Sequence, residues 1–253
     1  MKLSGLQKLT LLDYPGHLAA ILFLPGCNFR CPFCQNSSLV LTPNQTPEIP
    51  MDEFLHFLKK RSGILEGICV TGGEPTLHAD LPQLFQTIHD AGYLAKLDTN
   101  GTNPDMLEQL LQEQLVDYVA MDIKAGRKNY ARVCGLQTGF AGTDAQLCIS
   151  DSRPTASAAT MLDKVMRSAQ LLMTSRIDYE FRTTTVRGLH SAEDFADIAN
   201  WIDGCKAYYL QSFRDCPEVL QQAHSFSAFS REEMEAFLQI VQKKIPTATL
   251  REA

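Results

Sequence analysis

The sequence predicts an α/β fold in which six strands form a partial, TIM-like (β/α)6 barrel that is laterally open. Six short apolar runs alternate with six segments of helical periodicity, which is the order of a mainly parallel sheet. Polar clusters follow the first five runs. A barrel brings all such strand ends to one mouth, whereas a doubly wound sheet converges mainly those beside its switch point. Because six units are fewer than the eight of a closed barrel, we expect an incomplete one.

The first predicted strand, Leu18 to Leu24, is almost continuously apolar and ends at Pro25-Gly26, as expected for a strand buried on both faces. Similar runs predict strands at Gly67 to Thr71, Leu94 to Asp98, Val116 to Asp122, Tyr179 to Val186 and Ala207 to Gln211. Helices are predicted at Met51 to Arg61, Leu81 to Ala91, Pro104 to Gln114, Met161 to Ser175, Ala192 to Ile202 and Arg231 to Lys243. Four are preceded by residues suited to N-capping, namely Asp80, Asn103, Ser191 and Ser230.

No linker or internal repeat divides the chain, so a single domain over residues 1–253 is predicted. Residues 1–18 are expected to form an N-terminal extension. Residues 134–160 are rich in Gly, Ser, Thr, Asp and Ala without clear periodicity, and they are predicted to be a long loop insertion. Both a functional loop and a disordered segment fit this composition.

The formal net charge of −6, without a block of basic residues, argues against nucleic acid as a partner. The first residues lack the apolar core of a signal peptide, and no apolar run approaches the roughly 20 residues needed to cross a bilayer. We therefore expect a cytoplasmic protein with no membrane association. In that compartment the eight cysteines should be reduced thiols, for which metal binding is a better interpretation than disulfide bonding.

Three cysteines, Cys27, Cys31 and Cys34, follow the first predicted strand in a CxxxCxxC arrangement. They supply three thiolates, one fewer than a closed tetrahedral zinc site or a fully ligated iron–sulfur cluster needs. The spacing alone leaves two interpretations open: a zinc knuckle with a distant fourth ligand, or a cluster with one open position. Isolated histidines, including His190, have no metal-ligand spacing and are expected to be structural or surface residues.

Gly72, Gly73 and Glu74 follow the second predicted strand, before Pro75. They can form an ordinary strand-to-helix turn, in which glycine permits unusual dihedral angles. They can also form a binding element, because a carboxylate beside two glycines pairs with an ammonium group while the backbone comes close to the ligand.

Polar residues also end three later strands. Asp98 and Thr99 precede an Asn-Gly turn, and Asp122 and Lys124 alternate on one strand and so point to the same side. A barrel mouth would bring Asp98 near this pair, although a surface ion pair is the plainer interpretation. Arg182 shares a strand face with Glu180. It either reaches a cofactor or only neutralises Glu180 inside the barrel.

With the aromatic Phe33 before Cys34, the CxxxCxxC segment resembles the signature of radical S-adenosylmethionine (SAM) enzymes. The resemblance implies a radical SAM core, with a [4Fe-4S] cluster on the three cysteines and SAM bound to the open iron. It implies that Phe33 lies near the adenine and that Gly72, Gly73 and Glu74 bind the methionine amino group. The SAM contacts that it implies elsewhere are Asp98, Thr99, Asp122 and Lys124. Since the two aspartates would repel a bound carboxylate unless Lys124 or a cation intervened, we also expect a monovalent cation near them.

A narrower resemblance, which covers most of the chain, is to the anaerobic ribonucleoside-triphosphate reductase activating proteins. It is carried by Leu12-Asp13-Tyr14-Pro15-Gly16, Phe23 to Asn36, Asp98 to Gly101, Met121 to Lys124 and Glu180 to Thr184. The sequence departs from that family at residues 134–160. It also has Leu210 to Arg214 where the related pyruvate formate-lyase activase has a cofactor-binding histidine.

This resemblance implies an enzyme that cleaves SAM reductively to a 5′-deoxyadenosyl radical, which then generates a glycyl radical on a partner enzyme. The implied partner is an anaerobic ribonucleotide reductase, and the implied reductant is flavodoxin or ferredoxin. Two other functions stay open. One is a radical SAM enzyme that acts on a small molecule, such as 7-carboxy-7-deazaguanine synthase. The other is a non-enzymatic zinc or iron–sulfur binding module.

Overall fold

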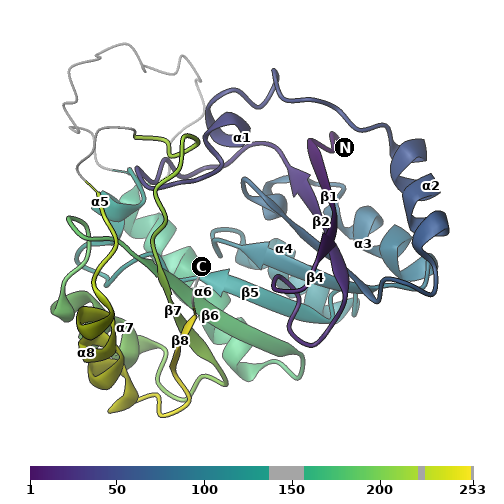
Figure 1. Cartoon of the computed structure of the whole chain (residues 1–253). Coiled ribbons are helices and arrows are strands. Elements are labelled where there is room, and N and C mark those ends of the chain that lie inside the picture. Colours follow the sequence, from purple (N-terminus) through teal and green to yellow (C-terminus); the bar gives the residue numbers. More distant parts are fainter. Residues whose placement is uncertain (137–156, 222–225, 252–253) are drawn as a thin grey trace.

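The computed structural model of this chain describes residues 1–136, 157–221 and 226–251. Its strands are β1 (Gly5–Thr10), β2 (Ala19–Leu24), β3 (Gly67–Gly72), β4 (Leu94–Thr99), β5 (Tyr118–Asp122), β6 (Asp178–Thr185), β7 (Tyr208–Ser212) and β8 (Thr249–Arg251). They form one sheet in chain order (Figure 1). β1 is antiparallel to β2, and every later neighbour is parallel. Adjacent placement of successive strands is the order of a barrel, so the prediction of a laterally open α/β barrel is confirmed.

The helices lie mostly on the outer side of the curved sheet, except the first, which lies at its open end (Figure 1). They are α1 (Ser37–Leu41), α2 (Met51–Arg61), α3 (Leu81–Asp90), α4 (Pro104–Gln112), α5 (Tyr130–Val133), α6 (Ala158–Thr174), α7 (Ala192–Trp201) and α8 (Arg231–Gln242), with a short 3-10 helix, η1, at Pro75–Leu77. Every strand and helix predicted from the sequence is present, with small differences at the ends.

Three of the four predicted N-caps are confirmed. The Asn103 side chain accepts a hydrogen bond from the backbone of Met106 at 3.4 Å. Ser191 and Ser230 each form a capping box, at the starts of α7 and α8. The prediction for Asp80 is wrong, because its carboxylate makes no capping bond to α3 and instead lies 2.8 Å from the terminal amine of Met1.

The predicted N-terminal extension, residues 1–18, is part of the barrel. It contains β1, an edge strand whose middle residues are exposed and therefore carry little hydrophobic pattern. It also contains Tyr14, which is 2% exposed and packs against Tyr118 with ring centroids 5.9 Å apart. Gly67 leaves room for this ring, since a Cβ there would lie 2.7 Å from it. Tyr14 therefore fills the barrel at the amino-terminal ends of the parallel strands.

The predicted loop over residues 134–160 is described only at its ends. Cys134 directly follows α5 and is fully buried. Residues 158–160 belong to α6, whose N-cap is Ser157, so this end is helical. Residues 137–156 lie outside the described residues.

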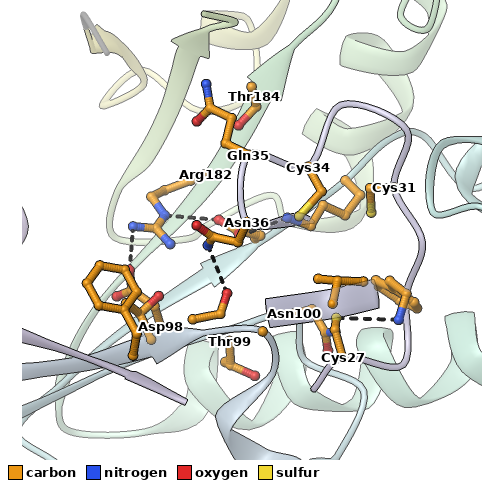
Figure 2. A pocket seen from close by; sticks show the side chains of 18 of the residues that line it. Cys27, Cys31, Cys34, Gln35, Asn36, Asp98, Thr99, Asn100, Arg182 and Thr184 are labelled. Atoms are coloured by element: carbon orange, nitrogen blue, oxygen red, sulfur yellow. Dashed lines mark hydrogen bonds and ion pairs between the residues drawn. The ribbon is translucent and has the colours of Figure 1, made fainter. Parts of the chain in front are cut away.

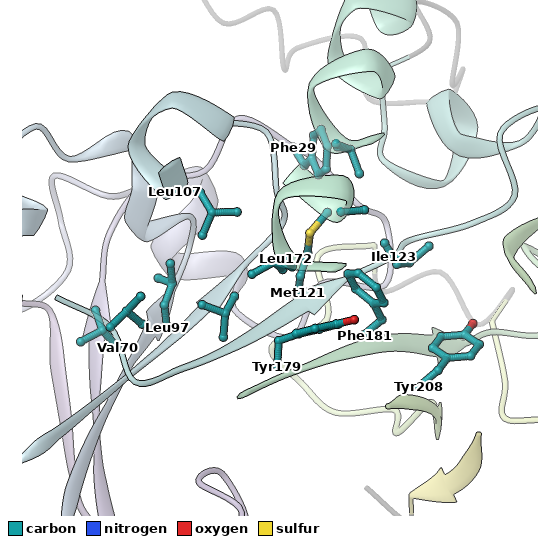
Figure 3. Close-up of a cluster of buried hydrophobic side chains, with 14 of the residues drawn as sticks. Phe29, Val70, Leu97, Leu107, Met121, Ile123, Leu172, Tyr179, Phe181 and Tyr208 are labelled. Atoms are coloured by element: carbon teal, nitrogen blue, oxygen red, sulfur yellow. The ribbon is translucent and has the colours of Figure 1, made fainter. Parts of the chain in front are cut away.

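The two faces of the sheet differ in chemistry. Side chains on the outer face form the hydrophobic core, where strand residues such as Leu97 and Phe181 pack toward Leu107 of α4 and Leu172 of α6 (Figure 3). The alternate residues point into the barrel, and many of them are polar. Because the register of β5 and β6 pairs Asp122 with Arg182, both side chains project inward next to each other.

No helix in the described ranges combines the length and the hydropathy needed to span a bilayer. The cysteines in those ranges form no disulfide bond.

Candidate active site

A cavity of about 420 Å³ opens at the carboxyl ends of the parallel strands (Figure 2). One wall is the loop after β2, which carries the three cysteines, and the opposite wall consists of inward-facing side chains of β4, β5 and β6. The predicted site residues that line it are Cys27, Cys31, Phe33, Cys34, Gly72, Gly73, Asp98, Thr99, Asp122, Lys124 and Arg182. The barrel thus brings together every predicted site residue except the side chain of Glu74.

The cysteine loop turns sharply after β2 at Gly26, which has a φ of +87°. Inside the loop, the backbone N–H of Cys34 donates to the Cys31 carbonyl at 3.0 Å, and the N–H of Phe29 donates to Cys27 Sγ at 3.4 Å. Burial, with a smaller contribution from the charge of Glu74, raises the pKa of the Cys27 thiol to about 12. In the described part of the chain, no three His, Cys, Asp or Glu side chains are grouped to hold a single metal ion.

Two asparagines fasten the cysteine loop to the strand ends beside it. Asn100, after β4, donates to the side-chain oxygen of Asn28 at 2.9 Å, and its amide also lies 3.8 Å from Cys27 Sγ. Asn36 donates to the Gly72 carbonyl at 2.9 Å. The loop is therefore held by strands that are separated widely in the sequence.

Gly72 and Gly73 bring the backbone after β3 against the start of the cysteine loop. Gly72 has a φ of +120°, and a Cβ there would lie 2.3 Å from the Leu24 carbonyl oxygen. A Cβ on Gly73 would lie 1.9 Å from the Gly26 carbonyl oxygen. Both positions require glycine, because the close approach is to the residues that precede Cys27.

Replacing Gly73 by alanine is expected to displace the cysteine loop. The added methyl group overlaps the Gly26 carbonyl, so the variant should lose about 3 kcal/mol of unfolding free energy and much of its capacity to bind iron. Urea unfolding and iron analysis measure the two effects. Gly92→Ala is the control, because a Cβ at Gly92 meets no atom within 4 Å; its φ of +85° should cost only about 1 kcal/mol and leave iron binding unchanged. Equal stability and iron content in the two variants would contradict this account of Gly73.

The Glu74 carboxylate faces the protein interior, with no exposed surface. It accepts hydrogen bonds from the Thr76 backbone at 3.1 Å, the Thr76 hydroxyl at 2.5 Å, the Thr99 hydroxyl at 2.6 Å and the Asn100 backbone at 2.6 Å. Burial raises the pKa of Glu74, although these hydrogen bonds oppose the rise. Glu74 thus ties the turn after β3 to the turn after β4. This position differs from the expected direct contact with an ammonium group.

Charged side chains form a connected network on the strand wall of the cavity (Figure 2). The Arg182 guanidinium lies 3.1 Å from Asp98 Oδ2 and 3.0 Å from Asp122 Oδ1. Lys124 Nζ lies 2.9 Å from Asp122 Oδ2, and the buried Lys96 pairs with Asp98. Three cations therefore face two carboxylates, and these five side chains carry a net charge of 3 − 2 = +1.

The network keeps both carboxylates ionised. Burial alone would raise the pKa of Asp122, but Arg182 and Lys124 outweigh it and lower that pKa to about 2. The pKa of Asp98 is also lowered, because Arg182 and Lys96 outweigh its burial. The alternative that Arg182 only neutralises Glu180 is wrong, since Arg251 pairs with both oxygens of Glu180, at 2.6 and 2.7 Å.

The model of the Radical SAM superfamily matches residues 21–202, from β2 to the end of α7. The chain belongs to the radical SAM superfamily. The match covers the cysteine loop, the Gly72-Gly73 turn and the charged network. Membership implies a [4Fe-4S] cluster and SAM as cofactors and identifies the protein as an enzyme.

Three known proteins show how far the similarity extends. A provisionally named glycyl-radical enzyme activating enzyme of Methanocaldococcus jannaschii is 28% identical over 252 residues, 98% of this chain and 95% of that protein. The 7-carboxy-7-deazaguanine synthase of Aquifex aeolicus is 33% identical over 79 residues, 31% of this chain and 34% of that protein. The crystal structure of a radical SAM methyltransferase from Sphaerobacter thermophilus has a TM-score of 0.65 and 16% identity, over 97% of this chain and 68% of that chain.

The residues of the cavity fit the two groups that radical SAM proteins use. Three free thiols line one side of it, and they are the ligand type that iron–sulfur clusters require. The opposite side offers carboxylates and cations for the charged ends of SAM. Phe33 is 5% exposed and lines the same cavity, with Lys124 Nζ 6.0 Å from its ring centre.

Sequence reasoning missed three residues that shape this site. Lys96 is two residues before Asp98 on β4, so the alternation that linked Asp122 to Lys124 could have found it. Asn36 and Asn100 had no such signal, because their partners, Gly72 and Asn28, are distant in the sequence.

Proposed function

We propose that this radical SAM enzyme generates a glycyl radical on a partner enzyme, an anaerobic ribonucleoside-triphosphate reductase. The observation that carries the proposal is the similarity to an activating enzyme along 98% of this chain. The choice of partner is supported by the segments Leu12 to Gly16 and Glu180 to Thr184, which resemble those of the anaerobic ribonucleoside-triphosphate reductase activating proteins.

Cys27, Cys31 and Cys34 would ligate three irons of the cluster and leave the fourth open for SAM. When bound, the reduced cluster supplies the electron that cleaves SAM to methionine and a 5′-deoxyadenosyl radical. The protein holds the thiols in place through Asn28, Asn36 and the glycine turn. Since one CxxxCxxC segment supports one cluster, the electron would come from flavodoxin or ferredoxin, as available in the cytoplasm.

The SAM molecule would lie between the cysteine loop and the charged network. Gly72 and Gly73 line the cavity and offer backbone groups to the methionine amino group. Glu74 supports that turn from behind. The surplus positive charge of the network suits the methionine carboxylate, while Asp98 and Asp122 can accept from ribose hydroxyls or the amino group. Thr99 would contact SAM beside them, with its hydroxyl held by Glu74. Phe33 would flank the adenine.

The monovalent cation near Asp98 and Asp122 stays a prediction. Each carboxylate already has two cationic partners. Lys96, Lys124 and Arg182 therefore already provide the positive charge for which a bound cation was predicted. Anomalous scattering and a comparison of activity in sodium and potassium salts test the point.

The proposed reaction moves one hydrogen atom. The 5′-deoxyadenosyl radical takes a hydrogen from the glycine Cα of the partner, which leaves 5′-deoxyadenosine and a glycine-centred radical. The test is electron paramagnetic resonance of the reductase after incubation with reduced protein and SAM, with a reductase whose radical glycine is replaced by alanine as the control. We expect a glycine-centred signal in the first sample only. Cleavage of SAM with no such signal would contradict the proposal.

A second candidate, a radical SAM enzyme for a small heterocycle, is favoured by the similarity to 7-carboxy-7-deazaguanine synthase. That similarity covers only 31% of this chain, so this candidate ranks below the generation of a glycyl radical. Tight binding of a pterin-like compound, without a glycyl radical on the reductase, would support it.

A further inference from the structure

The polarity of the inward face of β6 changes toward the cavity mouth. Glu180, Arg182 and Thr184 follow one another on this face. Glu180 is fully buried and paired with Arg251, and Arg182 joins the charged network. Thr184, the next inward residue, is uncharged and lines the cavity. On the β6 side, the cavity is therefore charged near the middle of the strands and uncharged at the mouth, whereas Lys124 carries a charge on the β5 side of the mouth.

Three side chains from separate segments form this uncharged end. The register of β6 and β7 pairs Thr184 with Gln211, so these side chains are neighbours that both line the cavity. Gln35, from the cysteine loop, lines the same cavity as Thr184 (Figure 2). Its amide nitrogen donates to the Arg214 carbonyl at 2.7 Å, which fixes the side chain and leaves its oxygen available.

The side-chain polar groups of Thr184 and Gln211 have no hydrogen-bond partner within the described ranges of the chain, whereas the Gln211 backbone carbonyl accepts from the Thr185 hydroxyl. Both residues are half-buried, so their donors and acceptors face the cavity. A ligand that forms hydrogen bonds with partly buried polar groups lacking a protein partner gains binding free energy from them. A hydroxyl and two carboxamides match amide N–H and C=O groups, and they cannot neutralise a formal charge.

The charges of SAM and the uncharged mouth divide the cavity between two molecules. The ammonium and carboxylate of SAM require the charged end, where cations and carboxylates can compensate them. The β6 and β7 side of the mouth is left for a ligand with neutral polar groups. A glycine residue has only its backbone amide groups for recognition, because it has no side chain.

We propose that Thr184 and Gln211, with Gln35, form hydrogen bonds to the peptide backbone beside the target glycine and so orient the Cα hydrogen of that glycine. The subsite therefore recognises the backbone of an extended peptide segment and not its side chains. This inference rests on the proposed function.

The test measures binding of a synthetic peptide that spans the radical glycine of an anaerobic ribonucleoside-triphosphate reductase. The reconstituted, unreduced protein is saturated with SAM, and affinity is followed by fluorescence anisotropy. Thr184→Val and Gln211→Met keep side-chain volume and remove hydrogen-bonding groups. We expect each to weaken peptide binding about fivefold and the double variant about 25-fold, with unchanged affinity for SAM. Ser212→Ala is the control, since Ser212 neighbours Gln211 and does not line the cavity.

Two results would overturn the inference. One is a peptide affinity that is undetectable in the unsubstituted protein or equal in the double variant and the control. The other is a parallel loss of SAM affinity, which would assign both residues to the cofactor site. The proposed function fails separately, if the unsubstituted protein gives no glycyl radical on the full reductase. A radical that forms equally fast with the double variant, at limiting reductase, would leave that function intact and refute the peptide subsite.

Discussion

Replacing Cys27, Cys31 or Cys34 by alanine is expected to abolish the cluster and all SAM cleavage. All three thiols line the same cavity, and a site-differentiated cluster already has one iron without a protein ligand. Loss of one cysteine leaves only two protein ligands, which should not retain the cluster. After anaerobic reconstitution, we expect about four irons per unsubstituted chain and less than about a tenth of that in each variant.

Cys205→Ala is the matched control for this series. Cys205 is buried at 6% exposure, and burial raises its pKa to about 12, but it does not line the cavity. It should keep full iron and full SAM cleavage. A variant of the cysteine loop that binds iron as well as Cys205→Ala would remove that cysteine from the ligand set.

Replacing Arg182 by methionine should have the second-largest effect. The change leaves Asp98 and Asp122 with one lysine each, in a site where Arg182 is only 12% exposed. We expect a loss of about 3 kcal/mol in unfolding free energy at neutral pH, the low end for breaking a buried ion pair because the lysines remain. SAM affinity should fall by about tenfold or more, since two carboxylates then face the methionine carboxylate.

The stability loss should depend on pH in a defined direction. In the unsubstituted protein the pKa of Asp122 is lowered to about 2 from 3.8, so its ionisation stabilises the fold above pH 4 and this stabilisation is lost as pH falls through 2. Without Arg182 this pKa rises, and protonation relieves the uncompensated charge. The deficit measured by urea unfolding should therefore be constant above about pH 4 and shrink as pH falls from 4 toward 2.

Arg127→Met serves as the control for Arg182→Met. Arg127 pairs with Asp197 through three side-chain hydrogen bonds but is 45% exposed, and exposed pairs contribute less than about 1 kcal/mol. Equal losses of unfolding free energy in the two variants would show that the charged network stabilises the fold no more than an exposed ion pair.

The strands could be predicted because each apolar run faces a helix or the core on its outer side. The inward residues were partly predictable by alternation, which placed Lys124 beside Asp122 correctly. The same rule would have found Lys96. Edge strand β1 and the three-residue β8 were missed because exposed or very short strands leave little pattern.

The remaining differences come from contacts between distant segments. The partners of Glu180 are Tyr118 and Arg251, and no local spacing indicates either. Glu74 was expected to face a ligand, yet four donors from two different turns surround it. Long-range partners of this kind become visible only when the strand order and register are known.

The central claim is that SAM binds between the cysteine loop and the charged network, in contact with the open iron. Electron–nuclear double resonance of the reduced protein tests it most directly, using SAM labelled isotopically in its amino nitrogen and carboxylate oxygens. We expect hyperfine coupling of both labels to the cluster, and weaker SAM binding in Arg182→Met. A protein with a full complement of iron that shows no coupling at saturating SAM would contradict the claim.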